Sequence, residues 1–453
     1  MPTRRAALVA LVATPLAAAQ EPPALTLSTF SAEVTIPVGH PCMGGGVAPV
    51  KEVLDPLEAR GFVLRGAGRP VVFLAVDWCE VRNTAYDRFR QKIAAAVGTD
   101  PVRVMLCALH QHDAPIFDTA AEELLEKHKA NASVGSVAVF ERLTSAVADA
   151  AAACLKTARR VTHLGTGRAR VEQVASNRRY VDEGGAVRYN RMSATRDPKV
   201  RAAGEGTIDP ELKLLSFWDG DTALAGLSAY AVHPMSFYGR GGVSADFVGL
   251  ARRRLQADTP AALQLYASGC SGNVTAGKFN DGDPGNRPVL ADRMYRAMAA
   301  AWRDTRKTPV TTPTFRSVPL TLESRGGDEF TIEALTRRLT SDARPFGRCL
   351  AALGLSWANR VRAGIPVDVP VLDFGGAALT VLPAESYVEF QLAAQRARPA
   401  DFVVVAGYGE CGPGYIPVER AWAENDGNLS DWCWVARGCE ARMTDAIRRA
   451  LAR

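Results

Sequence analysis

The sequence predicts an α/β fold with mixed β-sheets flanked by helices, built as one large domain. In the first part of the chain, apolar runs at 71–76 and 102–109 enclose a segment of helical spacing at 84–97. Farther along, two pairs of apolar runs enclose the short turns Asp219–Thr222 and Gly375–Gly376, a pattern typical of β-hairpins. Strand–helix–strand units together with hairpins favour mixed sheets.

The composition is that of an ordinary folded protein. The chain has 453 residues, of which 47% are hydrophobic and 23% charged, so it is long enough to bury a large core. The formal net charge of +6 comes from scattered arginines without a basic block. Nucleic acid is therefore not a predicted partner.

The N-terminus predicts export. Met1–Arg5 is basic, Ala6–Leu16 is mostly apolar and Ala17–Ala19 offers small residues for cleavage, so residues 1–19 are typical of a secretory signal peptide. The pair Arg4 and Arg5 leaves a twin-arginine signal open. We expect a mature chain of residues 20–453 that is soluble in the periplasm or outside the cell.

Other elements follow from the same apolar spacing. We expect a hairpin at 212–232, a helix that opens at Ser244–Gly249, and a hairpin at 369–382. The remaining expected strands are 25–37, 263–267, 318–323 and 402–406, and the remaining helices are 140–159, 289–302, 330–340 and 440–453. Nine cysteines permit disulfides in an exported chain, for example between Cys433 and either Cys439 or Cys411.

Two histidines end one of the apolar runs. Residues two apart face the same side of an extended backbone, so His110 and His112 can both look into one cleft. Neutral imidazole is a common ligand of catalytic metals. The alternative is a hydrogen-bonded polar pair, which is the commoner role of such a motif, so a metal site needs further ligands from elsewhere.

Other strand ends supply such candidates. The run at 223–232 leads directly into His233, and the hairpin at 369–382 leads into Glu385. A buried structural histidine and an exposed glutamate at a helix start are the alternatives for these two. The loop from Ser268 to Gly282 is rich in small polar residues, and a serine nucleophile there lacks the Gly-x-Ser-x-Gly pattern.

Two further loops carry groups suited to an anionic or polarised substrate. The glycine-rich turn Val38–Gly46 can bring backbone amides to an oxyanion, or it is simply a tight turn. Arg178 or Arg179 can hold a carboxylate, a phosphate or a polarised carbonyl, with a surface salt bridge as the alternative.

The order of these motifs resembles that of the neutral/alkaline, non-lysosomal ceramidase family, through its N-terminal catalytic domain. Leu109–Pro115 resembles the family's Thr-His-Thr-His-Ser-Gly-Pro segment. The other matching motifs follow in the family's order, namely Asn177–Arg178, Ala231–His233, Ser244–Asp246, Ser268–Cys270, Leu382–Glu385 and Gly407–Pro417.

The resemblance implies a zinc site and a division of roles. The zinc ligands would be His110, His233, Glu385 and Tyr415. His112 would face the substrate carbonyl, Arg178 would orient the substrate, and Met43–Gly46 would be the oxyanion region. Ser268 matches a serine considered as nucleophile, ranked below a metal-bound water.

Two departures concern the substrate side of the resemblance. The family's Tyr-Glu-Gly-Ala-Ser segment has no counterpart, and Asn425–Cys439 carries two tryptophans and two cysteines in its place. The C-terminal immunoglobulin-like domain of the long ceramidases is not expected within the chain. Both departures affect the substrate side of the resemblance and leave the metal side intact. Ceramide is therefore only one example of the substrates that the resemblance implies.

We therefore predict an exported zinc-dependent hydrolase that cleaves an amide bond, with an N-acyl small molecule or lipid such as ceramide as substrate. Zinc lowers the pKa of bound water toward about 7, and either His112 or Asp113 would protonate the leaving amine. The alternatives are a serine-dependent esterase or amidase using Ser268 and a binding protein without chemistry. Contact with a membrane surface and the oligomeric state stay open.

Overall fold

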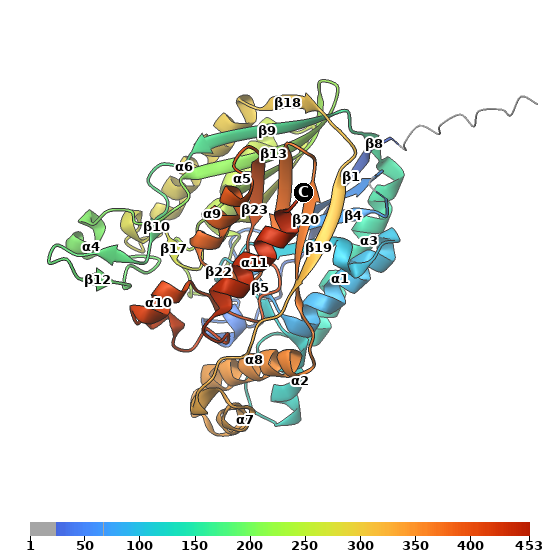
Figure 1. Ribbon diagram of the computed structural model, residues 1–453. Coiled ribbons are helices and arrows are strands. Elements are labelled where there is room, and N and C mark those ends of the chain that lie inside the picture. Colours follow the sequence, from blue (N-terminus) through green and yellow to red (C-terminus); the bar gives the residue numbers. More distant parts are fainter. Residues whose placement is uncertain (1–23, 67) are drawn as a thin grey trace, which may run out of the picture.

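The computed structural model describes residues 24–66 and 68–453. The predicted signal peptide, residues 1–19, lies outside the described residues. Three sheets make up the body of the protein (Figure 1). The first has the order β6-β4-β3-β1-β8, with β1 at Thr26–Glu33, β3 at Glu58–Arg65, β4 at Val71–Val76, β6 at Val104–Ala108 and β8 at Arg159–Arg160.

The second sheet has the order β16-β14-β13-β9-β18, and the third has the order β19-β20-β21-β23. The second contains β9 (His163–Arg170), β13 (Glu211–Asp219), β14 (Thr222–Tyr230), β16 (Leu263–Ser268) and β18 (Arg306–Pro309). The third contains β19 (Thr314–Leu320), β20 (Val367–Asp373), β21 (Ala377–Val381) and β23 (Phe402–Ala406). Each main sheet is antiparallel except for one parallel pair, so the predicted mixed α/β fold is confirmed.

Helices cover the outer faces of these sheets. Helix α3 packs on β1, α6 packs on β9 and α11 packs on β19 and β20 (Figure 1). The helices are α1 Asn83–Val97, α2 Thr119–Lys127, α3 Val137–Cys154, α4 Pro198–Ala202, α5 Asp246–Asp258, α6 Asn286–Arg303, α7 Ile332–Ser341, α8 Pro345–Arg362, α9 Val388–Ala397, α10 Glu419–Ala423 and α11 Cys439–Leu451.

The three parallel pairs share one construction. In each, a strand is followed by a helix and then by a second, parallel strand of the same sheet. The three units are β4-α1-β6, β14-α5-β16 and β21-α9-β23. Parallel strands require such a crossover, and ligands usually bind beyond the carboxyl ends of parallel strands.

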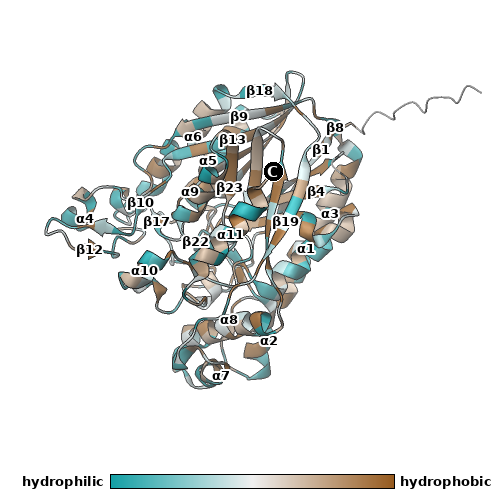
Figure 2. Cartoon of the chain, viewed as in Figure 1, coloured by the Kyte–Doolittle hydropathy of each residue, from teal (hydrophilic) through white to brown (hydrophobic). Residues whose placement is uncertain are grey.

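Strand β4 explains why the parallel strands read as unbroken apolar runs. All six of its residues are buried. Val72, Leu74 and Val76 belong to one apolar core, whereas Val71, Phe73 and Ala75 belong to the second core on the opposite face. Because successive side chains point to opposite faces, a strand between two cores has no polar side. Figure 2 shows the hydrophobic residues concentrated on the central strands.

The structure corrects several expected boundaries. The strand expected at 102–109 begins at Val104, because Pro101–Arg103 forms a 3₁₀ turn. The helix expected at 140–159 ends at Cys154, and the strand expected at 318–323 is β19, at Thr314–Leu320. The structure also contains elements that were not expected, among them the helices α2 and α8 and the strands β3 and β9. The two strands were missed because glycines and charged residues interrupt their apolar spacing.

All nine cysteines lie within the described residues, and each is buried and free, so the pairs considered for Cys433 do not form. No helix in the described part of the chain is long and apolar enough to cross a membrane.

A buried ion-pair network ties α5 to the first sheet. The Arg252 guanidinium donates to both oxygens of Asp77, at 2.6 and 2.7 Å, and to Glu58 at 3.0 Å. Arg252 is 1% exposed. Since α5 belongs to the second unit and Asp77 follows β4, this network holds the first two units in register.

We expect Arg252→Ala to lower the free energy of unfolding by about 3–5 kcal/mol, because it leaves Asp77 buried without its partner. Urea unfolding followed by circular dichroism measures the change. The matched control is Arg254→Ala on the same helix, whose exposed pair with Asp292 contributes at most about 1 kcal/mol. Equal losses in the two variants would contradict this account.

Candidate metal and catalytic site

The ends of the three strand–helix–strand units meet at one point, and hydrogen bonds close them into a ring. The Ala108 amide of the first unit donates to the carbonyl of Tyr408 at 2.9 Å, and the Gly407 amide of the third donates to that of Ser268 at 2.7 Å. The Ser268 hydroxyl completes the ring by donating to the carbonyl of Leu109 at 2.7 Å. Every loop beyond these strand ends therefore faces a common centre.

Three of the predicted metal ligands occupy this centre. His110 Nε2 lies 3.2 Å and His233 Nε2 lies 3.0 Å from the same oxygen, Oε2 of Glu385. All three residues are at most 2% exposed. Their ligand atoms lie within 4.8 Å of one another, as binding to a single metal ion requires. The structure thus brings together residues that are 275 positions apart in the sequence at most (110 to 385).

The other ring nitrogen of each histidine faces a main-chain carbonyl. His110 Nδ1 lies 3.1 Å from the oxygen of Cys79, and His233 Nδ1 lies 2.5 Å from that of Ser271. These contacts place the proton on Nδ1 and turn the lone pair of Nε2 toward Glu385.

With both ring protons on Nδ1, two imidazole lone pairs and a carboxylate oxygen point at one another. Lone pairs at this spacing repel unless a proton or a cation lies between them. Two imidazoles and one carboxylate are the donor set of many catalytic zinc sites, so these residues fit such a metal.

The electrostatics of the three residues differ. Burial lowers the pKa of His233 to about 4, helped by the charge of Arg178, so its imidazole is neutral at pH 7. Burial would also lower the pKa of His110, but Glu385 raises it above the usual value. Burial would raise the pKa of Glu385, but the two histidines hold it well below the usual range. The carboxylate is therefore ionised and the His233 ligand needs no deprotonation at neutral pH.

Tyr415 and Arg178 form the next part of the site. The Arg178 guanidinium donates to the Tyr415 hydroxyl oxygen at 2.6 Å, and Arg178 is 2% exposed. Strand β24 (Tyr415–Ile416) pairs in parallel with β22 (Glu385–Ser386), which holds Tyr415 beside Glu385. Burial raises the pKa of Tyr415 although Arg178 opposes the shift. In the described part of the chain, Nε of Arg178 has no hydrogen-bond partner, so the guanidinium retains a free donor.

His112 borders the metal-binding residues without joining them. Its ring lies 5.3 Å from that of His110 and 4.8 Å from that of Tyr238, and it is half-buried. Burial and the two neighbouring histidines hold its pKa well below the usual value. Its Nδ1 has no partner, so a neutral ring has a nitrogen available for proton transfer.

The Asp113 side chain is bonded to the loop that carries Tyr238. Its Oδ1 accepts a hydrogen bond from the Gly239 amide at 2.8 Å. Burial raises the pKa of Asp113 to about 6, which the Gly239 amide and the more distant Arg287 partly oppose.

The turn Met43–Gly46 is bonded to Ala114 and offers few donors. The Met43 amide donates to the carbonyl of Ala114 at 2.8 Å, and the amides of Gly45 and Gly46 close the turn itself. Three of its four amides are engaged in this way. The turn can therefore supply at most the Gly44 amide to an oxyanion.

Ser268 is fully buried at the ring described above, and its hydroxyl is bonded to a carbonyl oxygen. Among the described residues, no histidine nitrogen is hydrogen-bonded to it. The buried position of Ser268 at this ring accounts for the resemblance at Ser268–Cys270 by a structural role. Gly272 in the same loop lies so close to the Glu385 carbonyl that a Cβ would overlap it.

Sequence reasoning missed Tyr408 and Glu80. The Tyr408 ring stacks on that of His110, with centroids 4.3 Å apart, and its hydroxyl bonds Ser271 at 2.6 Å. Glu80 is fully buried, with Oε1 3.7 Å from His110 Nδ1. Tyr408 stands in the loop after β23, whereas Glu80 begins the short strand β5 (Glu80–Val81) soon after β4. The strand-end signal that found His110 was not applied to either residue.

Strained backbone gathers at this site. Met43, His110, Ala384 and Tyr408 have positive φ angles of 46°, 71°, 52° and 54°, although none is a glycine. Such angles cost energy and persist where the surrounding structure requires them, often at functional sites.

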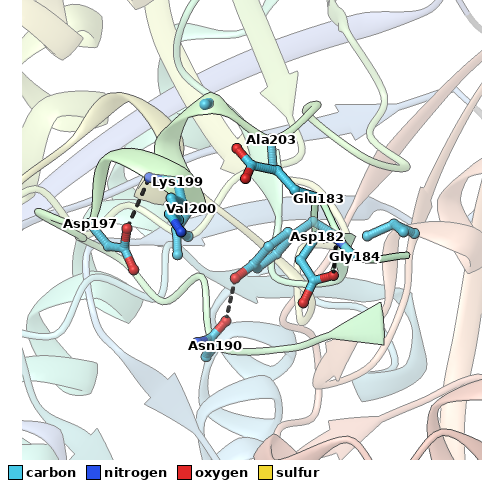
Figure 3. A pocket seen from close by; sticks show the side chains of 11 residues that line it. Asp182, Glu183, Gly184, Asn190, Asp197, Lys199, Val200 and Ala203 are labelled. Carbon is cyan, nitrogen blue, oxygen red and sulfur yellow. Dashed lines mark hydrogen bonds between the residues drawn. The ribbon is translucent and has the colours of Figure 1, made fainter. Parts of the chain in front are cut away.

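A separate cavity of about 500 Å³ lies on an arm formed by residues 171–209 (Figure 3). The arm carries β10 (Ser176–Asn177), β11 (Tyr180–Val181), β12 (Val187–Arg188) and α4, and it projects from the body in Figure 1. Inside the cavity, Tyr180 donates to Asn190 at 2.8 Å. Its lining contains none of the candidate metal ligands.

Comparison with known proteins bears on the fold. No protein-family model and no curated protein matches the sequence. A solved neutral ceramidase from Pseudomonas aeruginosa is similar, with a TM-score of 0.67 and 17% identity over an alignment that covers 94% of this chain and 73% of that one. The chain has the ceramidase fold. A ceramidase complexed with C2 matches with a TM-score of 0.66 and 16% identity, covering 94% of this chain and 74% of that chain.

The ceramidase fold confirms the resemblance inferred from the motif order. At this identity the likeness concerns the fold, and the site rests on the geometry of the residues themselves.

We expect the stability of the wild type to fall, relative to Asp113→Asn, as the pH rises from about 4 through 6. The folded state holds the Asp113 proton more tightly than the unfolded state, so ionisation in this interval favours unfolding. The difference should change by about 2–3 kcal/mol between pH 4 and pH 7.5. Urea unfolding of both proteins at the two pH values measures it, and a difference independent of pH would contradict the buried, protonated Asp113.

Proposed function

We propose that the protein is an exported, metal-dependent hydrolase that cleaves an amide bond. The proposed metal is zinc, held by His110, His233 and Glu385 with Tyr415 completing the site. The observation that carries the proposal is the convergence of two Nε2 lone pairs and one carboxylate oxygen, with each Nδ1 committed to a carbonyl. The ceramidase fold supports the choice of an amide as the bond cleaved.

When bound, zinc would polarise the substrate carbonyl and lower the pKa of a water molecule. The other contributions come from the chain. Arg178 is buried, charged and has a free Nε, so it can donate to the oxygen that gains negative charge during attack. It is held in place by its hydrogen bond to Tyr415.

We assign proton transfer to His112. Its ring is neutral, its Nδ1 is free and it packs directly against His110. It can accept the proton of the attacking water and pass it to the leaving amine. Asp113 is less suitable because its carboxylate is bound to the Gly239 amide.

We propose an N-acylated small molecule or lipid as the substrate, with ceramide as one example. The two similar structures support the class, since both are ceramidases. The engaged hydroxyl of Ser268 makes a serine mechanism the less favoured reading.

Purified protein should contain about one zinc per chain, and His233→Ala should contain less than about a tenth of that. Loss of one imidazole removes a ligand and leaves Glu385 without its neighbour. Elemental analysis measures the metal. The control is His128→Ala, which removes a histidine outside the site and should keep the full content. Metal-free wild type, or equal content in both variants, would refute the metal site.

Ser268→Ala and Arg178→Ala distinguish the two hydrolytic mechanisms. We expect Ser268→Ala to keep kcat/KM for an N-acyl amide within about threefold, and Arg178→Ala to lower it about 10²–10³-fold through loss of an oxyanion donor. Both should retain zinc by elemental analysis. Activity abolished in Ser268→Ala, with metal and fold intact, would favour the serine mechanism.

A further inference from the structure

Two consecutive arginines of the arm bind different partners. Arg178 is 2% exposed, and its guanidinium donates to the Tyr415 hydroxyl oxygen at 2.6 Å. Arg179 is only partly buried, and its guanidinium donates to both carboxylate oxygens of Glu424, from Nε at 2.6 Å and from Nη2 at 2.7 Å. The salt bridge that the sequence left open for either arginine is therefore formed by Arg179.

Glu424 binds the arm through both of its oxygens. Besides the two bonds from Arg179, Oε2 accepts a hydrogen bond from the Tyr189 hydroxyl at 2.6 Å. These hydrogen bonds, that of Arg179 above all, lower the pKa of Glu424 to about 2 although burial opposes the shift, so the carboxylate is ionised at neutral pH. Single surface ion pairs contribute little, but a bidentate pair that belongs to a network fixes the geometry of its members. We call Arg179, Tyr189 and Glu424 the clamp.

The clamp joins the arm to the part of the chain that carries Tyr415. Helix α10 lies between Tyr415 and Glu424 in the sequence. Farther along, the Asn428 side-chain amide donates to the carbonyl of Tyr189 at 3.5 Å. We call residues 415–428 the C-terminal segment. This segment meets the arm at the buried hydrogen bond of Tyr415 and at the partly exposed clamp.

The arm itself is tied by its main chain to the loop that follows the second unit. Strand β10 pairs with β17 (Val274–Thr275), and the Arg178 amide donates to the carbonyl of Asn273 at 2.7 Å. Among the described residues, by contrast, no hydrogen bond between two main-chain groups joins residues 171–209 to residues 415–428. Side chains therefore set the distance between the arm and the C-terminal segment, and the clamp supplies three of the five hydrogen bonds that join them.

Arg178 requires this distance to stay constant. Its main chain belongs to the arm, whereas its hydrogen-bond partner Tyr415 belongs to the C-terminal segment. If the two parts separate, the guanidinium loses the bond that orients it. A donor to a developing oxyanion has to lie about 2.7–3.1 Å from the oxygen, and a displacement of about 1 Å can lower the rate about 10²-fold.

We propose that Glu424 is a positioning residue, which holds Arg178 in the candidate site by clamping Arg179 and Tyr189. Among the described residues, Glu424 forms no hydrogen bond with the candidate metal ligands, so it acts through Arg178. The effect on catalysis rests on the proposed function, in which Arg178 donates to the oxyanion. The effect on the position of the arm does not.

Hydrogen–deuterium exchange of the purified full chain tests the position of the arm. Glu424→Gln keeps the shape of the side chain and removes its charge. We expect the amides of residues 176–179 to exchange at least about threefold faster in this variant, with or without added zinc. Tyr189→Phe removes one bond of the clamp and should change the same amides in the same direction by less. This second variant decides the question if Glu424→Gln disturbs the fold by circular dichroism.

The matched control is Asp182→Asn. Asp182 also pairs with an arginine of the arm, Arg188, and its side chain is 27% exposed against 23% for Glu424. Among the described residues, it forms no hydrogen bond with the C-terminal segment. The control should leave the exchange at 176–179 unchanged. Unchanged exchange in Glu424→Gln, or an equal change in the control, would overturn the proposal.

The kinetics of hydrolysis of an N-acyl amide test the link to Arg178. Glu424→Gln should lower kcat about tenfold and change KM by less than about twofold, because Arg178 acts on the transition state. Its zinc content should equal that of the wild type. In the Arg178→Ala background the same substitution should have no further effect, within about twofold, because the clamp acts through that side chain. A purely structural role would lower the activity of both backgrounds equally, which would overturn the proposal.

The two measurements separate this proposal from the proposed function. Faster exchange at 176–179 in Glu424→Gln, with no hydrolysis by the wild type, would support the clamp and refute the hydrolase. Hydrolysis by the wild type, with equal exchange in the two proteins, would refute the clamp alone.

Discussion

The structure depends on the closure of three strand ends around one centre. Each unit ends in a parallel strand whose next residues have no sheet partner of their own, so their backbone groups need other bonds. The amides of Ala108 and Gly407 and the hydroxyl of Ser268 supply them by bonding the neighbouring unit. These bonds fix the direction of the side chains beyond the strands, and three of them meet as candidate metal ligands.

The same closure accounts for the electrostatic character of the site. Burial withholds water from His110, His233 and Glu385, and main-chain carbonyls fix the protons of both imidazoles on Nδ1. An ionised carboxylate is then left facing two lone pairs. A cation would relieve this arrangement, so the three residues suit a metal ion. The positive φ angles at His110, Ala384 and Tyr408 show that the backbone adopts strained conformations around these side chains.

The sequence identified three candidate metal ligands that lie together, but it missed parts of the framework around them. An apolar run that stops at a histidine or a glutamate marks the end of a buried strand, and that rule found His110, His233 and Glu385. It could not measure their separation, because the distances depend on three sheets that contact one another only in the fold. The prediction missed strands β3 and β9 because glycines and arginines interrupt their apolar pattern. It missed Tyr408 because a buried tyrosine is normally a packing residue.

The segment that departs most from the resemblance supports the metal side of the site. The Tyr415 amide donates to the carbonyl of Trp432 at 2.9 Å, and the Trp434 amide donates to that of Pro413 at 3.0 Å. Gly414 lies so close to this pair that a Cβ would overlap the Trp432 carbonyl.

From the same segment, Asp426 accepts a hydrogen bond from the Tyr387 hydroxyl at 2.5 Å, just beyond Glu385. Residues 425–439 thus contact Tyr415 directly and Tyr387, two residues after Glu385, through Asp426. The partly buried Trp432 ring is stacked on Phe346 with centroids 6.3 Å apart. The residues that differ from the resemblance therefore lie behind and beside the candidate metal ligands.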